Sequence, residues 1–99
     1  KDDIIKSRGE KVSPREVEDV IHRHPAVAET AVVGVPDALL GEAIKAFVVT
    51  KPGFNLDAKD ILGHCAGRLE DFMVPQFVEF RDELPKSDNG KILKQELKA

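Results

Sequence analysis

The sequence predicts an α+β domain in which a small three-stranded, mostly antiparallel sheet carries two main helices. Apolar residues recur at helical spacing in two segments behind polar capping residues, and three other segments are rich in residues that favour strands. Pro, Gly, Asp and Asn separate these segments. An N-terminal hairpin precedes the unit, and a mobile lysine loop follows it near the C-terminus. The 99 residues suit one domain with one modest core.

The N-terminal hairpin is expected from two short extended segments, residues 3–7 and 11–13. Between them, Gly9 holds the tight position of the turn, because glycine adopts left-handed backbone angles without a steric penalty.

A first helix should start at Pro14, with Ser13 as its N-cap and Glu16 completing a capping box. Apolar residues follow at positions 17, 20 and 21, with a histidine at position 24 on the same face, so one face of the helix is expected to be buried. The helix should end before Pro25.

Three segments are predicted strands. Residues 27–35 are rich in Val and Ala, and Pro36 is expected to break this strand. Residues 42–50 alternate in a way typical of a second strand, and residues 76–80 form the third, with Val78 and Phe80 on one face and Phe77 on the other.

A second helix is predicted behind the N-cap Asp57, with an apolar stripe that continues to residue 69. Cys65 lies inside this stripe and is interpreted as a core residue rather than a nucleophile. His64 lies on another face and is interpreted as a solvated neighbour of charged residues. Gly63 and Gly67 each cost a helix about 1 kcal/mol relative to Ala, so close packing is expected there.

Composition excludes several classes of function. The net charge is −3 and the chain contains no Tyr or Trp, so nucleic acid is not an expected partner. No apolar run approaches the roughly 18 residues of a membrane span. A single cysteine excludes an internal disulfide and any multi-cysteine metal site, and it fits a reducing compartment such as the cytoplasm.

The most informative stretch lies at residues 85–94, where Asp88, Asn89 and Gly90 form strong turn chemistry. Lys91 therefore sits at or beside a loop tip. A phosphate-binding P-loop is excluded, because Pro85 and Ile92 occupy the positions where that motif needs Gly and Ser or Thr. On spacing alone, a solvated basic turn remains the alternative.

Two motifs together carry a resemblance to a known family. Residues 84–97 (LPKSDNGKILKQEL) resemble the final motif of the AMP-forming adenylating enzymes, and residues 2–18 (DDIIKSRGEKVSPREVE) are similar to the hinge segment of the same family. The resemblance covers the whole chain but only the small, mobile C-terminal domain of these enzymes. Residues 1–99 are thus expected to be one domain of a longer polypeptide, with a hinge segment and hairpin at residues 1–13 and a catalytic lysine loop at residues 81–94.

The resemblance implies a role for each matching residue. Lys91 matches the lysine that stabilises charge when a carboxylic acid attacks ATP. Asp2 matches the hinge residue about which the domain rotates between the two half-reactions. Gly9 matches the glycine that lies beside the pantetheine arm of coenzyme A (CoA). Lys11 matches a phosphate-binding residue of some members, and Lys6 also belongs to the hinge motif. ATP and CoA would be substrates, and Mg²⁺ would be bound mainly by the N-terminal domain that these residues lack.

Within the family, Lys86 and residues 92–94 resemble acyl-CoA synthetases of fatty acid metabolism, which join an acid to CoA with release of AMP and pyrophosphate. Asn89 before Gly90 resembles the adenylation domains of nonribosomal peptide synthetases, which are the first alternative. A luciferase-type enzyme and a non-catalytic binding module that retains the fold remain open. Its expected partners are its own N-terminal domain and the small molecules acid, ATP and CoA. Because the ATP and acid pockets belong to that N-terminal domain, the isolated fragment is expected to be inactive.

Overall fold

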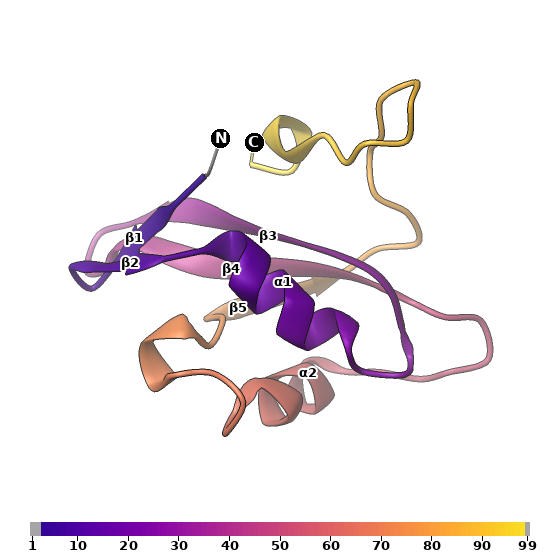
Figure 1. The fold of residues 1–99 in the computed structure, drawn as a ribbon, viewed down its shortest axis with the longest axis horizontal. Coiled ribbons are helices and arrows are strands. Elements are labelled where there is room, and N and C mark those ends of the chain that lie inside the picture. Colours follow the sequence, from indigo (N-terminus) through magenta and orange to yellow (C-terminus); the bar gives the residue numbers. More distant parts are fainter. Residues whose placement is uncertain (1–2, 99) are drawn as a thin grey trace.

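The structure is a computed structural model and describes residues 3–98. Figure 1 shows the order of the elements along the chain, which begins with the N-terminal hairpin. The elements are β1 (Ile5–Ser7), β2 (Glu10–Val12), α1 (Pro14–His22), β3 (Val27–Asp37), β4 (Gly41–Thr50), α2 (Ala58–Cys65), the 3₁₀ turn η1 (Asp71–Met73), β5 (Phe77–Phe80) and the 3₁₀ turn η2 (Lys94–Glu96).

Strand β4 is the centre of the sheet. It pairs antiparallel with β3 along almost its whole length, and on its other side residues 45–48 pair in parallel with β5. Near its start, Gly41 pairs with Ser7 of β1, so the N-terminal hairpin joins the same sheet. The predicted fold class is confirmed, but the sheet has five strands rather than three because the hairpin is part of it.

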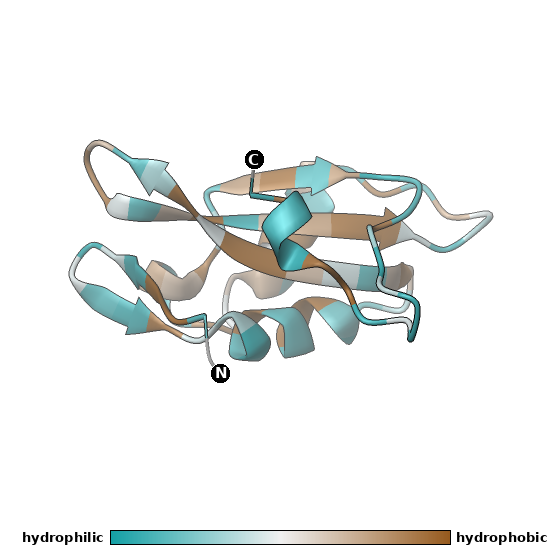
Figure 2. Ribbon diagram, turned by 90° about the horizontal axis from the view of Figure 1, so that it is seen from above, coloured by the Kyte–Doolittle hydropathy of each residue, from teal (hydrophilic) through white to brown (hydrophobic). Residues whose placement is uncertain are grey.

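The sheet is covered on both faces. Helices α1 and α2 lie on one face, and the C-terminal segment crosses the other, as Figures 1 and 2 show. Alternate residues of the central strands feed two apolar clusters: Val32 joins the helix-side cluster, whereas Ala31 and Val33 join the cluster beneath the C-terminal segment. The second cluster therefore determines where the lysine loop is held.

The predicted helix starts are confirmed. Pro14 begins α1, and the Ser13 hydroxyl accepts a hydrogen bond from the Glu16 backbone N–H at 3.4 Å. The hydrogen bonds of the described residues do not include the reciprocal bond of a full capping box, in which the Ser13 backbone N–H would donate to the Glu16 carboxylate. Helix α2 has both halves of such a box, between Asp57 and Asp60.

The prediction that the second helix continues to residue 69 is wrong. Helix α2 ends at Cys65, and Gly67 has φ +85°, an angle that no helix contains. The expected close packing at the two glycines is also wrong, because a Cβ at Gly63 or Gly67 would meet nothing within 4 Å. Gly67 is instead a turn residue that directs the chain toward β5.

The prediction that Pro36 breaks its strand is wrong as well. Strand β3 continues through Pro36, which pairs with Glu42, to Asp37. Among the described strands, β3 pairs with β4 alone and is an edge strand, so a residue without a backbone N–H is tolerated there.

The third strand matches its prediction: Val78 and Phe80 pack against the helix-side core, and Phe77 is half exposed. Near the C-terminus, the chain forms the 3₁₀ turn η2. Within residues 3–98, every helix is too short or too polar to cross a membrane.

Candidate functional site: the Lys91 loop

The loop that carries Lys91 is closed by its own backbone. Lys86 and Ile92 form an antiparallel bridge across its base, and the Ser87 N–H donates to the Lys91 carbonyl at 2.8 Å. Gly90, at φ +85°, makes the tight turn that the Asp-Asn-Gly sequence predicts. The Ser87 hydroxyl accepts from the Lys91 N–H at 3.2 Å and donates to Asn89 Oδ1. The backbone of Lys91 is thus fixed by its neighbours.

The side chain of Lys91 is exposed and borders an open groove of about 730 Å³. Among the residues that the structure describes, Lys91 has no ion-pair partner. The groove runs between the lysine loop and the start of α1, and its lining residues are Asp3, Ser13, Pro14, Arg15, Glu18, Lys91 and Lys94. An ammonium group in this position is available to an anion outside the domain.

The two lysines that flank Lys91 are held by acidic partners. Lys86 Nζ lies 3.0 Å from Glu29 Oε1 on β3, and Lys94 Nζ lies 2.6 Å from Glu18 Oε2 on α1. Glu18 Oε2 also accepts the Val32 backbone N–H at 2.8 Å. Of the three lysines, the two outer ones are therefore fastened to the domain and the middle one is not.

Apolar side chains hold the loop from beneath. Leu84 within the loop and Leu97 just after it are buried with Phe47, and Ile92 packs against the same cluster. The positive charges of Lys45 and Arg81 lie 4.8 and 5.0 Å from the centre of the Phe47 ring, as cation–π contacts.

Both of these cations also bind Glu79. Its carboxylate accepts from Lys45 Nζ and from Arg81 Nε, each at 2.8 Å. The bond from Lys45, and next the bond from Arg81, lower the pKa of Glu79 below its usual range. This cluster ties β4 and β5 to the first residue of the loop.

The N-terminal hairpin turns at two residues with positive φ, Arg8 (57°) and Gly9 (78°), as a two-residue hairpin turn requires. The Arg8 N–H donates to the Leu40 carbonyl at 2.9 Å, which joins the hairpin tip to the β3–β4 loop. A Cβ on Gly9 would meet nothing within 4 Å, so the backbone there is open to solvent. In the β3–β4 loop, Leu39 is 93% exposed.

Lys6 and Lys11 lie directly opposite each other in this hairpin, and both are exposed. Facing residues of an antiparallel pair project from the same side of the sheet, and like charges there are destabilising. The hairpin thus presents two positive charges together at a cost in stability. Asp2, the expected hinge, lies outside the described residues.

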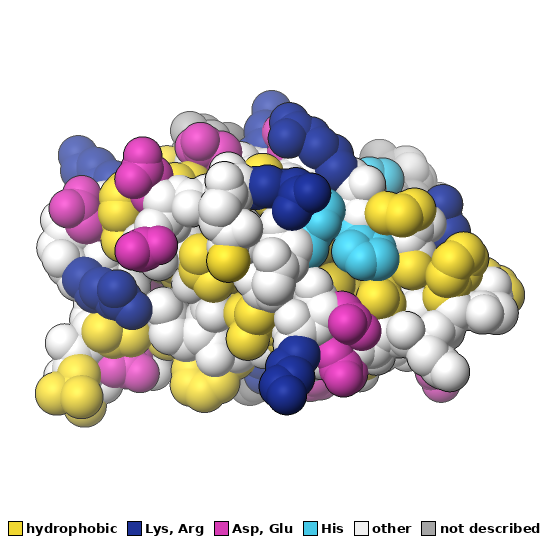
Figure 3. All heavy atoms as spheres, turned by 90° about the horizontal axis from the view of Figure 1, so that it is seen from below, with side chains coloured by type: hydrophobic (Ala, Val, Ile, Leu, Met, Phe, Trp, Pro, Cys, Tyr) yellow, Lys and Arg dark blue, Asp and Glu magenta, His cyan; other side chains and the backbone are white. Residues whose placement is uncertain are grey.

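His64 is not the solvated residue that its charged neighbours suggest. Its Nε2 lies 2.7 Å from the Val20 carbonyl, and its ring meets the His24 ring edge to face at 5.1 Å. His64 therefore joins α2 to α1, and histidine side chains lie together on the face seen in Figure 3. Cys65 is fully buried, as predicted, and burial raises the pKa of its thiol.

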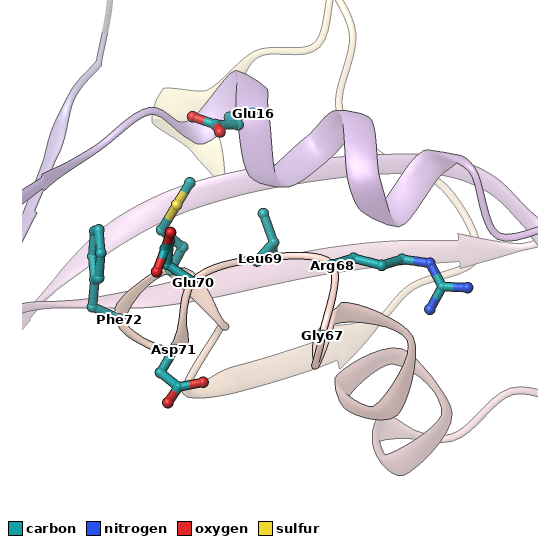
Figure 4. Close-up of a pocket in the computed structure, with 8 residues that line it drawn as sticks. Glu16, Gly67, Arg68, Leu69, Glu70, Asp71 and Phe72 are labelled. Atoms are coloured by element: carbon teal, nitrogen blue, oxygen red, sulfur yellow. The ribbon is translucent and has the colours of Figure 1, made fainter.

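A second open hollow of about 520 Å³ lies between the start of α1 and the segment after α2. Figure 4 shows Glu16 on one side and residues 67–73 on the other, with the Arg68 side chain extending away from the acidic ones. It contains none of the predicted site residues. Among residues 3–98, no group of three or more His, Cys, Asp or Glu side chains is placed to hold a metal ion.

Sequence reasoning missed Glu18 and Glu29, the partners of the flanking lysines. Glu29 carries a weak signal, because it is a charged residue inside an otherwise apolar strand. Glu18 carries none, since an acidic residue on a helix beside an apolar stripe is ordinary.

The sequence and the fold are similar to those of known proteins. The sequence profile of the family described as "AMP-binding enzyme C-terminal domain" matches residues 16–91. A long-chain-fatty-acid–CoA ligase of Yersinia pestis is 49% identical over 98 residues, which cover 99% of this chain and 17% of that protein.

Two crystal structures agree with this match. One is an acyl-CoA synthetase from Brucella canis, with 40% identity and a TM-score of 0.92 over 98% of this chain and 18% of that one. The other is ATP-bound MatB from Rhodopseudomonas palustris, with 37% identity and a TM-score of 0.94 over 98% of this chain and 19% of that one. The chain thus spans less than a fifth of the length of these proteins.

Proposed function

The chain belongs to the family of AMP-binding enzyme C-terminal domains, and from that premise we propose that it serves an AMP-forming acyl-CoA synthetase as the domain that supplies the adenylation lysine. The full-length enzyme would join a carboxylic acid, of the fatty acid class in the relatives' names, to CoA at the expense of ATP. The relatives are CoA ligases, so they do not favour the peptide-synthetase alternative.

Adenylation needs positive charge more than it needs a base. An ionised acid attacks the α-phosphate of ATP, and two anions must be held together while charge builds on the phosphoryl oxygens. A lysine ammonium supplies a compact charge with three hydrogen-bond donors. The proposed role of Lys91 is to bring that charge to the acid and the phosphate.

One observation carries this proposal: Lys91 is exposed at a groove and lacks an ion-pair partner among the described residues, whereas Lys86 and Lys94 each have one. If Lys91 were a structural residue of its own domain, it would be expected to have a carboxylate partner as its neighbours do. The closed backbone of the loop supports the same role, because it fixes the point from which the side chain extends.

The second half-reaction transfers the acyl group to a thiol, and Lys91 would then obstruct the acceptor. We propose that the domain rotates about Asp2 and presents the hairpin in place of the loop. The bare backbone at Gly9 supports a path for the pantetheine arm beside it. The facing pair Lys6 and Lys11 supports phosphate binding on the hairpin, because their charges repel each other unless an anion is near.

We propose that Mg²⁺ is bound mainly by the rest of the enzyme, in line with the finding that residues 3–98 hold no group of three or more His, Cys, Asp or Glu side chains placed to hold a metal ion. The domain's own N-terminal partner would likewise hold the ATP and acid pockets. We propose a cytoplasmic location, on the ground that the one cysteine needs no oxidising compartment.

The test uses the full-length enzyme with Lys91→Ala. Formation of the acyl-adenylate is expected to fall about a hundredfold to a thousandfold, the usual cost of one such electrostatic contact. Thioester formation from supplied acyl-adenylate should survive. Lys59→Ala, an exposed lysine on α2, is the matched control and should change neither step. Equal adenylation rates in wild type and Lys91→Ala would instead support a non-catalytic module.

A further inference from the structure

We propose that Glu18 and Glu29 are positioning residues that hold the two ends of the Lys91 loop, so that the domain presents Lys91 from a fixed base. The inference rests on the proposed function of Lys91 and adds the residues through which the fold controls it. Among the described residues, neither glutamate forms an ion pair with Lys91. Each instead holds a lysine on one side of it, Lys86 through Glu29 and Lys94 through Glu18.

The two pairs fasten the loop at opposite ends and to different elements. Glu29 belongs to β3, and its carboxylate holds the residue that begins the closed part of the loop. Glu18 belongs to α1, and its carboxylate holds Lys94, the residue that ends the loop and starts η2. A segment held at both ends by separate elements cannot swing about one of them.

Glu18 is the stronger of the two anchors. One oxygen, Oε2, accepts both from Lys94 Nζ at 2.6 Å and from the Val32 N–H at 2.8 Å. That N–H faces outward on the edge strand β3 and would otherwise be unpaired by the sheet. A single oxygen of Glu18 therefore joins α1, β3 and the loop. The ion pair itself is partly shielded from solvent, since the side chains of Glu18 and Lys94 are 22% and 24% exposed.

The same pairing has an electrostatic result. The carboxylates match the charges of Lys86 and Lys94, so among the described residues the loop keeps an unmatched positive charge at Lys91. An incoming anion is then drawn to Lys91 rather than shared among three mobile lysines. Position matters for this chemistry, because a displacement of about 1 Å at a reacting group can cost about a hundredfold in rate.

The first experiment is Glu18→Gln in the full-length enzyme. The glutamine carbonyl oxygen can still accept the Val32 N–H, but the charge that holds Lys94 is gone. We expect the rate of acyl-adenylate formation to fall about threefold to tenfold, as befits the loss of a partly exposed ion pair that aligns a charge. Thioester formation from supplied acyl-adenylate should be unchanged. The matched control is Glu16→Gln. Glu16 lies on the same helix but forms no ion pair among the described residues, so this change should alter neither rate.

The second experiment exchanges charges in the other pair. Glu29→Lys and Lys86→Glu should each lower the rate of adenylation, and the double variant should restore it to within about twofold of wild type, since the reversed pair fixes the loop equally well. This pair is independent of the Val32 contact, so it decides the matter if the Glu18 variant fails to fold. A double variant as slow as the worse single one would overturn the proposal, as would an equal loss in both half-reactions.

A variant in the Lys91→Ala background separates the two hypotheses. If Glu18 acts through Lys91, Glu18→Gln should have no further effect once Lys91 is alanine. If Lys91→Ala alone leaves adenylation unchanged, the proposed function fails. If Lys91→Ala abolishes adenylation but Glu18→Gln does not slow it in the wild-type background, only the positioning role fails.

Discussion

Glu42 occupies the space that a side chain at position 34 would need. A Cβ on Gly34 would lie 2.8 Å from Glu42 Oε2 and 3.1 Å from Ile5 Cγ2. At the same time, Glu42 Oε1 accepts the backbone N–H of Lys6 at 2.8 Å. The absence of a side chain at Gly34 therefore lets a carboxylate from β4 fasten the N-terminal hairpin to the sheet.

Gly34→Ala is expected to lower the free energy of unfolding by about 1–3 kcal/mol, because the new methyl group must displace either Ile5 or the carboxylate that binds Lys6. Urea unfolding of the 99-residue chain measures the change. Gly63→Ala is the matched control: the site is helical with nothing within 4 Å of a Cβ, so the chain should gain about 0.5–1 kcal/mol. A neutral Gly34→Ala would show that the carboxylate moves freely.

His64→Ala should also destabilise the chain, by about 1–2 kcal/mol. The substitution removes the hydrogen bond with the Val20 carbonyl and the edge-to-face contact with His24. His22→Ala is the control, since His22 is exposed and meets a backbone carbonyl only at 3.3 Å. Thermal unfolding of both variants decides the question, and equal midpoints would return His64 to the role of a surface residue.

The contact between Gly34 and Glu42 shows what the sequence alone does not predict. Local signals placed the elements well: Ser13 and Asp57 cap the helices as predicted, and Gly9 turns the hairpin. The attachment of that hairpin to the sheet was missed, because it depends on Gly34 and Glu42, whose relation appears only once β3 and β4 are paired.

Boundaries failed where tertiary context overrides local preference. Pro36 is a strand breaker by propensity, but β3 is an edge strand, and that position is not written in the local sequence. The apolar stripe of α2 continues in the sequence beyond Cys65, where the helix ends, and Gly67 with its positive φ is the local signal for that end.

In the candidate site, too, the sequence predicts the local turn but not the contacts between distant residues. The exposed turn at Lys91 follows from Asp-Asn-Gly chemistry alone. Its anchors do not, since Lys86 and Glu29 are 57 residues apart and no spacing rule connects them. Short-range patterns thus predict the turn that exposes Lys91, whereas the residues that hold this turn in place are apparent only from the fold.

Acid should weaken the link between the sheet and the loop through Glu79. Lys45 and Arg81 lower its pKa in the folded chain, so this carboxyl binds fewer protons when folded than when unfolded. Its contribution is complete above the usual value of 4.5 and is lost as the pH falls through the lowered folded value. In Glu79→Gln, stability should therefore fall less steeply below that pH. Urea unfolding of the wild type and of Glu79→Gln over a pH series tests this, and equal slopes in the two proteins would contradict it.

The facing lysines of the hairpin make the last prediction, in which stability and function should move in opposite directions. Lys11→Glu replaces a repulsion across the β1–β2 pair by an attraction to Lys6, and should raise the free energy of unfolding by about 0.2–1 kcal/mol. If the pair binds a phosphate of CoA, the same change should raise the KM for CoA in the full-length enzyme and leave adenylation unaffected. Lys51→Glu, an exposed lysine beyond the end of β4, should alter neither quantity. A stabilised Lys11→Glu enzyme with an unchanged KM for CoA would remove phosphate binding from the hairpin, because its charge would then have been reversed without loss.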